Sequence, residues 1–337
     1  MTTAVGFPPQ RSAAILRAQL TELQETASQR RAEAVTGRLA DPTAALNGRV
    51  GAPLAIERAL GDIEGYRQTI ALATTRADTA QGVIDQLRQM LDDVTNQAEI
   101  ARQSGSQNGL ETASALAAGF LNGAVSGLNS RIAGRSLFAG DAADMPALVD
   151  AETLRAEVVS VLQAAPDAAT AEADLRVAFN TPGGLFDTTL YLGGSGDAPS
   201  AEIARDERVD YQARADEQVF RDFLRGMAVL SATYDPDVAL APADRATLLE
   251  GAIAELRNVV DPLNRIAARI GAVEGRIATV SARHTAEETA LTRSYNDLTG
   301  VDSLVAATEL QAIDSQLEVL FLTTARFSQL SLVNFLR

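Results

Sequence analysis

The segment from Ala59 to Ala101, ALGDIEGYRQTIALATTRADTAQGVIDQLRQMLDDVTNQAEIA, decides the fold of this chain. Apolar residues recur along it at alternating spacings of four and three, the heptad pattern of helices that pack along their length. The thirteen seam positions are Ala59, Ile63, Tyr66, Ile70, Ala73, Ala77, Ala80, Ile84, Leu87, Leu91, Val94, Ala98 and Ala101. At about 1.5 Å per residue such a helix is roughly 65 Å long, far longer than an ordinary globular helix. The pattern therefore predicts one long helix that packs against others.

The composition of the 337 residues narrows the class of protein. Hydrophobic residues make up 46% of the chain, but aromatic residues make up only 4% and Trp is absent. We therefore expect small apolar side chains to form most of the buried core. The formal net charge is −15, and every one of the 29 basic residues is an arginine. Nucleic acids and anionic membranes attract basic surfaces, so we expect neither as a partner.

Three absences in the sequence bear on chemistry and location. The chain has no Cys, so it has no disulfide and no thiolate nucleophile or metal ligand. Residues 1–10 lack a basic region followed by an apolar run, so we expect no cleaved signal peptide. No stretch approaches the roughly 18 uninterrupted apolar residues that would indicate a membrane-spanning helix.

Heptad seams also run through both ends of the chain. Their apolar members are Leu16, Leu20, Leu23 and Ala27 near the N-terminus, and Leu310, Ile313, Leu317, Leu320 and Phe327 near the C-terminus. The simplest path that joins two such ends runs out and back, with the two termini paired as a coiled coil. Apolar seams of this kind usually mark association faces, so we predict that these residues form an assembly interface.

The predicted fold class is mainly α: an elongated rod of long antiparallel coiled-coil helices, with the N- and C-termini paired and a small α+β insert in the middle. A second seam, from Leu256 to Val305, supplies the returning helix, and Pro262 should kink that helix or start a new one. In the insert, segments such as Leu185–Leu192 could be strands. We divide the chain into a terminal coiled-coil assembly domain (1–42 and 294–337), a helical rod domain (43–140 and 209–293) and the insert (141–208).

The sequence offers little for catalysis or cofactor binding. Its one histidine, His284, lies on the second seam beside Glu287, where a structural polar contact is the favoured interpretation. A metal site needs convergent ligands, and no second His or any Cys is present. A Walker-type phosphate loop needs a lysine, which the chain lacks, so Gly193–Gly196 is interpreted as a loop tip. The 44 carboxylates are interpreted as solvated helix faces. We therefore expect no enzyme, no cofactor and no metal site.

Four short motifs occur in order along the two helical ends. They are Thr36–Pro42 (TGRLADP), Leu128–Gly140 with its final LFAG, Ser294–Asp297 followed by Asp302 and Leu310–Gln311, and the tail Gln329–Arg337. Together they resemble the bacterial flagellin family, in which a Gly-basic pair ends the first helix and an Asp-Pro leads into the rod. The resemblance covers roughly residues 11–140 and 217–337, and the insert matches no family that we can name.

The resemblance implies a structural role in the bacterial flagellum. The LFAG segment, the tail and the modest insert look most like the junction members of the family, which join hook to filament by axial packing of their terminal helices. A filament subunit of the same family is the alternative, and a cytosolic helical scaffold is a more distant one. The residues that match the family turn are Gly37, Arg38, Asp41 and Pro42.

The resemblance also implies partners and a location. It implies self-assembly into a ring or tube, contact with other hook-associated proteins and with flagellin, and an export chaperone bound at the C-terminal helix. It implies an extracellular place in the flagellum, reached through the flagellar type III apparatus without a cleaved signal peptide.

Overall fold

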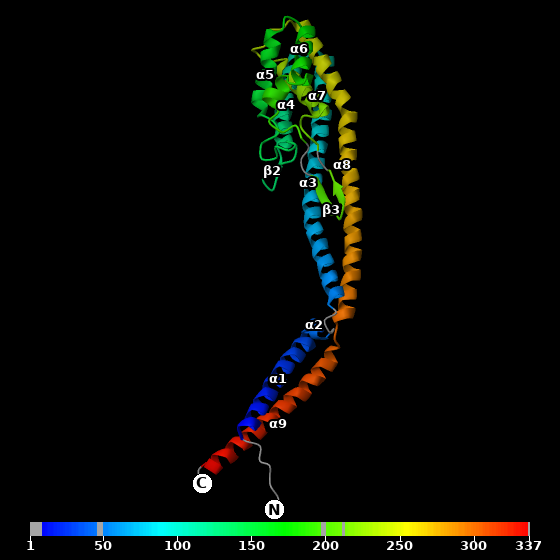
Figure 1. Ribbon diagram of the computed structural model, residues 1–337. Coiled ribbons are helices and arrows are strands. Elements are labelled where there is room, and N and C mark those ends of the chain that lie inside the picture. The colour runs from blue at the N-terminus through cyan, green and yellow to red at the C-terminus, as the bar shows by residue number, and fades with distance from the viewer. Residues whose placement is uncertain (1–8, 46–49, 197–199, 211–212, 336–337) are drawn as a thin grey trace, which may run out of the picture. The chain divides into compact units, whose positions relative to one another are not determined.

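The computed structural model describes residues 9–45, 50–196, 200–210 and 213–335, with side chains between residues 14 and 326 of those ranges. In chain order the elements are α1 (Pro9–Thr36), α2 (Pro42–Ala45), α3 (Gly51–Ser104), α4 (Gln107–Leu128), β1 (Arg131–Ile132), β2 (Arg135–Ser136), α5 (Ala151–Ala164), α6 (Ala168–Asn180), η1 (Phe186–Leu190), β3 (Ala201–Ala204), β4 (Glu207–Val209), α7 (Gln218–Ala232), α8 (Pro242–Thr299) and α9 (Ser303–Phe335) (Figure 1). The predicted mainly helical class with a small α+β portion is confirmed. Residues 1–64 with 284–337 form one compact unit, and residues 65–283 form a second.

The long helix predicted from the heptad seam is α3, which runs without a break for 54 residues. From Ile70 to Ala101 every seam position is buried, and in the first unit Ile63 is buried as well. In the second unit this seam shares one hydrophobic core with α8, which contributes its own seam from Leu256 to Val280. Ion pairs flank the contact, with Arg102 to Glu250 at 3.0 Å and Arg257 to Glu99 at 3.7 Å. The two heptad patterns therefore pack against each other in the second unit.

Of the two alternatives predicted for Pro262, a kink or the start of a new helix, the second is wrong. The helix α8 continues through it for 58 residues, and Asp261 does not begin a new helix. A proline inside a helix lacks one backbone donor, which costs stability. Here Val259 and Leu263, on either side of Pro262, are both buried in the core. Burial of the seam on both sides therefore favours one helix over two shorter ones.

The insert is built mainly from two short helices. Asp150 caps α5 by accepting from the Thr153 backbone N–H at 2.8 Å, and Asp167 caps α6 in the same way through Thr170 at 2.8 Å. Leu154, Leu175 and other apolar residues of these helices belong to the same hydrophobic core as α3 and α8. The division into three domains stays a prediction.

The expected strand at Leu185–Leu192 is wrong. Residues Phe186–Leu190 form a π-helical turn, and only Tyr191 makes an isolated antiparallel bridge, to Leu148. Phe186 and Leu190 are both fully buried, and residues four apart lie on one face of a helical turn. The short apolar run therefore buries its large side chains through a turn. The sheets in the described residues are two small antiparallel hairpins, β1–β2 and β3–β4.

Candidate assembly interface

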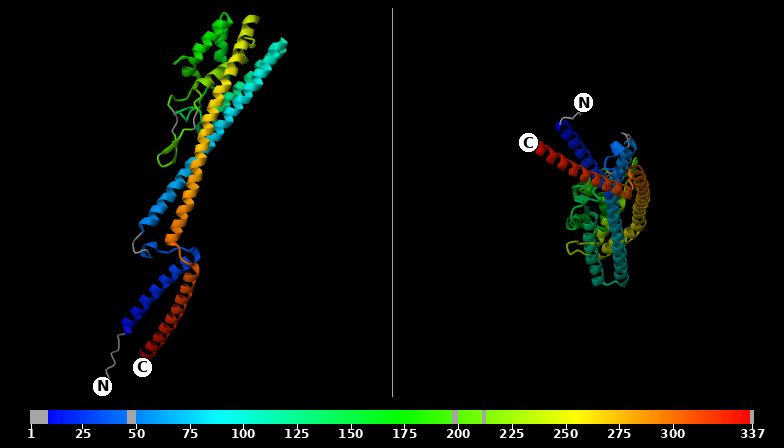
Figure 2. Two further views of the ribbon diagram at one scale, coloured as in Figure 1. Left: turned by 90° about the vertical axis from the view of Figure 1, so that its right-hand side faces the viewer. Right: turned by 90° about the horizontal axis from the view of Figure 1, so that it is seen from below.

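The helices α1 and α9 lie side by side as an antiparallel pair within the first unit (Figures 1 and 2). An ion pair of 2.8 Å joins Arg30 Nε on α1 to Glu309 Oε2 on α9. At the end of the pair, Arg38 forms an antiparallel bridge with Gly300. The predicted pairing of the two terminal helices is therefore present within one chain.

The predicted assembly residues lie along the contact between these two helices. Ala27 is buried, and the others whose side chains are described are half-buried: Leu16, Leu20, Leu23, Leu310, Ile313, Leu317 and Leu320. The side chain of Phe327 lies outside the described residues. The seams are therefore partly covered inside the chain, and their role between chains stays a prediction.

A second set of large apolar residues on α9 stays exposed outside the predicted seam positions. Val319, Phe321 and Leu322 are 59%, 53% and 58% exposed, and we call these three residues the outer face of α9. Phe321 and Leu322 also line a shallow groove with Leu317 and Ala325. Sequence reasoning missed this face, although its signal was present. The consecutive residues Leu320, Phe321 and Leu322 cannot all point to one seam of a helix.

The motif that resembles the family turn forms a compact cluster at the end of α1. Gly37 has φ +67°, a left-handed conformation that favours glycine at a helix end. Its carbonyl accepts from the Val301 N–H at 2.9 Å, and the Leu39 N–H donates to the Thr299 carbonyl at 2.8 Å. This short ladder ties the end of α1 to the junction between α8 and α9.

Arg38 extends the cluster through its side chain. Its Nη2 donates to Asn296 Oδ1 at 3.1 Å, and its guanidinium lies 5.6 Å from the centre of the Tyr295 ring. The Tyr295 hydroxyl donates to Glu57 Oε1 at 2.7 Å, and this hydrogen bond raises the pKa of the phenol. Arg38 therefore connects the turn after α1 to the end of α8, and Tyr295 connects it further to the first turns of α3.

A buried carboxylate that sequence reasoning did not single out supports the same turn. Glu33 is only 5% exposed and accepts from the Ala40 backbone N–H at 3.1 Å. Its other oxygen pairs with Arg30 at 2.6 Å. Glu33 matches no motif, because its role depends on a fold that returns residue 40 to the last turns of α1.

Asp41 and Pro42 start α2, as expected of an Asp-Pro pair. The Asp41 Oδ1 atom accepts from the backbone N–H groups of Thr43 and Ala44 at 2.9 and 3.0 Å. Pro42 occupies the first helical position, where its missing N–H costs nothing. All four predicted turn residues therefore have local structural roles.

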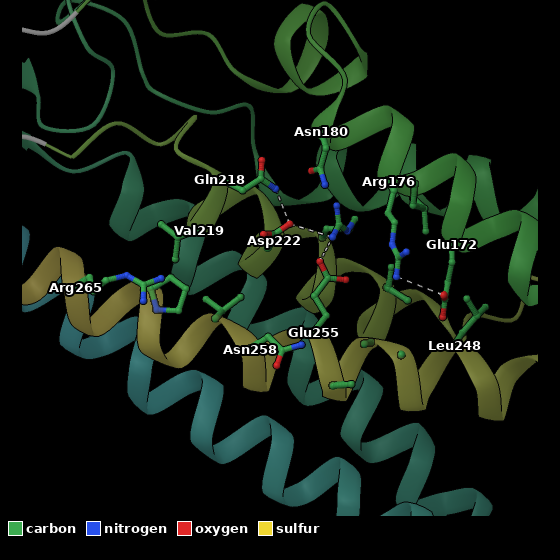
Figure 3. A pocket seen from close by; sticks show the side chains of 18 residues that line it. Glu172, Arg176, Asn180, Gln218, Val219, Asp222, Leu248, Glu255, Asn258 and Arg265 are labelled. Atoms are coloured by element: carbon green, nitrogen blue, oxygen red, sulfur yellow. Dashed lines mark hydrogen bonds and ion pairs between the residues drawn. The ribbon is translucent and has the colours of Figure 1, made fainter.

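The second unit contains a groove of about 610 Å³ lined by α6, α7 and α8. In Figure 3 the side chains of Asp222 and Glu255 point toward one place, where both pair with the Arg225 guanidinium. Arg225 is buried, and desolvation raises the pKa of Glu255. Paired charges of both signs line the groove, so we interpret this network as a link between α7 and α8.

His284 is buried, and its Nδ1 lies 3.9 Å from Glu287 Oε2, in keeping with a structural polar contact. Among the described residues, no three His, Cys, Asp or Glu side chains gather in a way that would hold a metal ion. None of the described helices is long and apolar enough to cross a membrane.

By its fold the chain is a mainly helical protein built from long helices, and its N-terminal and C-terminal helices pair with each other. No family model and no curated protein sequence matches the chain. Among solved structures, FlgL from Bacillus cereus matches with a TM-score of 0.52 and 14% identity, over 71% of this chain and 97% of that one. A protein described as a flagellar hook-associated protein of Vibrio parahaemolyticus matches with a TM-score of 0.49 and 15% identity, over 76% of this chain and 98% of that one. The chain therefore has the fold of B. cereus FlgL.

Proposed function

We propose that this chain is a structural component of the bacterial flagellum that works by association. The observation that carries the proposal is the outer face of α9. Three large apolar side chains stay more than half exposed on a helix pair whose own seam is already partly covered within the chain. An exposed apolar patch of this kind is typical of an interaction surface. The fold shared with B. cereus FlgL and the family motifs support a flagellar setting for that surface.

Within the flagellum, we propose the role of hook-associated protein 3, which joins hook to filament. The predicted seam residues hold α1 and α9 together, and the outer face of α9 then packs against neighbouring subunits. Axial packing of such pairs would build a ring or tube of this chain. Other hook-associated proteins and flagellin are its proposed neighbours.

The route to that location is a further part of the proposal. The family resemblance supports export through the flagellar type III apparatus without a cleaved signal peptide. Before export, a chaperone bound at the C-terminal helix would cover the apolar residues of α9. The chain would then be extracellular, and its action would need neither a reaction nor a cofactor.

A deletion strain tests the proposal directly. Flagellin is assayed in the medium, and hooks are viewed by electron microscopy. For a junction protein we expect bare hooks and flagellin released into the medium, because filament subunits are made but cannot be anchored. Bare hooks without released flagellin would indicate that this chain is the filament subunit. Normal filaments would contradict both flagellar roles and favour a helical scaffold.

A further inference from the structure

Two features that cost stability meet at the groove lined by α6, α7 and α8, which we call the α6–α8 groove. One is Arg225, whose buried Nη1 group has no hydrogen-bond partner within the described residues. The other is Pro262, which lies in the interior of α8 and lines the same groove. A buried donor without a partner and a proline inside a helix each destabilise a fold. Natural proteins keep such costly features mainly at functional sites, which makes the α6–α8 groove a candidate binding site.

Arg225 holds an unused donor between two carboxylates. Its Nη2 group donates to Asp222 Oδ1 at 3.0 Å and also to Glu255 Oε1. Figure 3 shows the side chains of Asp222 and Glu255 converging in the groove. These two hydrogen bonds and the burial of the arginine side chain, which is only 7% exposed, fix the guanidinium in position. A ligand carbonyl that accepts from Nη1 would satisfy this donor and leave both ion pairs intact.

Pro262 leaves an acceptor on the wall of the groove. Proline has no backbone N–H, so the carbonyl of Asn258, four residues earlier in α8, lacks its usual helical donor. Asn258 and Pro262 both line the groove. A ligand N–H can therefore donate to this carbonyl. Together, Arg225 and Asn258 fit a ligand that accepts a hydrogen bond at one point and donates one at another.

The charges along the groove favour a neutral ligand. Three acidic and three basic side chains line it, namely Glu172, Asp222, Glu255, Arg176, Arg225 and Arg265. An anion in the groove would lie beside carboxylates, and a cation would lie beside guanidinium groups. Because like charges repel, a ligand of either sign loses much of what it gains from the opposite charges.

The remaining wall of the groove is aliphatic. Apolar side chains from all three helices line it, among them Leu175, Val219, Leu248 and Val259. No aromatic side chain is among the described residues that line it. Aliphatic walls bury an apolar side chain of a ligand, whereas sugar rings pack best on aromatic rings. The volume of about 610 Å³ lies within the range of clefts that hold small ligands.

We propose that the α6–α8 groove binds a short peptide segment of a partner protein. A main-chain carbonyl of the peptide accepts from Arg225, a main-chain N–H donates to the Asn258 carbonyl, and an apolar side chain packs on the aliphatic wall. A peptide supplies all three groups and needs no net charge. The site is independent of the proposed flagellar role, because it lies wholly within the second unit.

The site is tested with random heptapeptides displayed on phage, which are selected on the full natural chain. Ala254→Trp blocks the groove, because Ala254 is an exposed residue that lines it, so the indole enters the groove and not the core. Ala278→Trp is the matched control, since Ala278 is also exposed on α8 but lies outside the groove lining. Enriched peptides are synthesised with blocked ends, and calorimetry measures their affinities for all three chains. An array of glycans is the second probe.

We expect enriched peptides to bind the natural chain and Ala278→Trp equally, and to bind Ala254→Trp roughly tenfold more weakly or less. Pro262→Ala gives the Asn258 carbonyl its helical donor again, so peptide affinity should fall roughly two- to tenfold although the fold gains stability. A merely structural role of Pro262 would not produce that combination. Failure to enrich any peptide that Ala254→Trp weakens would overturn the proposal. Equal affinity in Pro262→Ala would overturn the hydrogen bond assigned to Asn258. Glycan binding that Ala254→Trp abolishes, without peptide binding, would overturn the assigned class of ligand.

Discussion

The outer face of α9 can be separated from ordinary surface by one matched pair of substitutions. Val319 on α9 and Val177 on α6 are almost equally exposed, at 59% and 60%, and both lie on helices. Val319→Asp and Val177→Asp therefore make the same chemical change at two helical positions of almost equal exposure. If only α9 packs against neighbouring subunits, only Val319→Asp should prevent assembly.

The expected size of the effect follows from the exposed area of Val319. Complete burial of a valine side chain contributes about 1.5–3 kcal/mol, so the exposed part of Val319 is worth about 1–2 kcal/mol when a neighbour covers it. The aspartate loses that gain, and the carboxylate adds a desolvation penalty of several kcal/mol unless it finds a partner. Together these effects weaken each contact by more than about a hundredfold, since about 1.4 kcal/mol corresponds to a factor of ten.

The assay measures assembly and folding separately. Complemented deletion strains are scored by swimming halo and by the fraction of hooks that carry filaments, and the purified chains are compared by thermal unfolding. We expect Val319→Asp to abolish assembly, with a melting temperature close to that of Val177→Asp. Normal assembly of Val319→Asp would refute the assignment of this face. Equal loss in both variants would mean that the effect is not specific to α9.

Four further predictions address the seam, the turn, the proline and an acid-sensitive pair. Leu317→Ala combined with Leu320→Ala should destabilise the α1–α9 pair by about 1–2 kcal/mol per residue. This is less than the roughly 2–5 kcal/mol expected at a fully buried site, because both side chains are half-buried. Hydrogen exchange should become faster in both helices, and unchanged assembly would count against the seam. Gly37→Ala should destabilise the turn by about 1 kcal/mol because of its positive φ, and denaturant unfolding that matches the natural chain would contradict this. Pro262→Ala should raise the free energy of unfolding by about 1–3 kcal/mol, because α8 then regains a backbone hydrogen bond; an unchanged or lower value would argue against it. Hydrogen bonds, first from Arg102 and then from Gln103, lower the pKa of Glu99 from 4.5 to about 2. The contribution of Glu99 to the free energy of unfolding is therefore complete above pH 4.5 and is lost as the pH falls toward 2. Glu99→Gln should make the free energy of unfolding less dependent on pH between 4.5 and 2, and an unchanged dependence in that range would refute the pairing.

The parts of the fold predicted from sequence are those that repeat. A heptad seam requires its apolar residues to share one side of a helix, so the burial of α3 from Ile70 to Ala101 was determined by spacing alone. The pairing of the two terminal helices followed from chain topology. The single turn at Gly37 followed from local chemistry, since a helix end in a left-handed conformation favours glycine.

The parts that sequence could not provide depend on distant contacts. Pro262 stays helical because core residues on both sides of it are buried, and that burial is decided by partners elsewhere in the chain. Phe186 to Leu190 forms a helical turn because two of its residues enter the core, whereas a short apolar run reads equally well as a strand. Glu33 and Glu207 bind groups seven and about seventy residues away, so neither belongs to any local motif.

The central claim is that this chain works by packing the outer face of α9 against neighbouring subunits. Because the chain has no cysteine, a single thiol introduced by Phe321→Cys can carry a photocrosslinker at a unique place, with Val177→Cys as the control. The labelled chains are added to hooks isolated from the deletion strain and irradiated. Our account predicts covalent adducts between subunits from position 321 and none from position 177. Adducts from position 177 alone would contradict it.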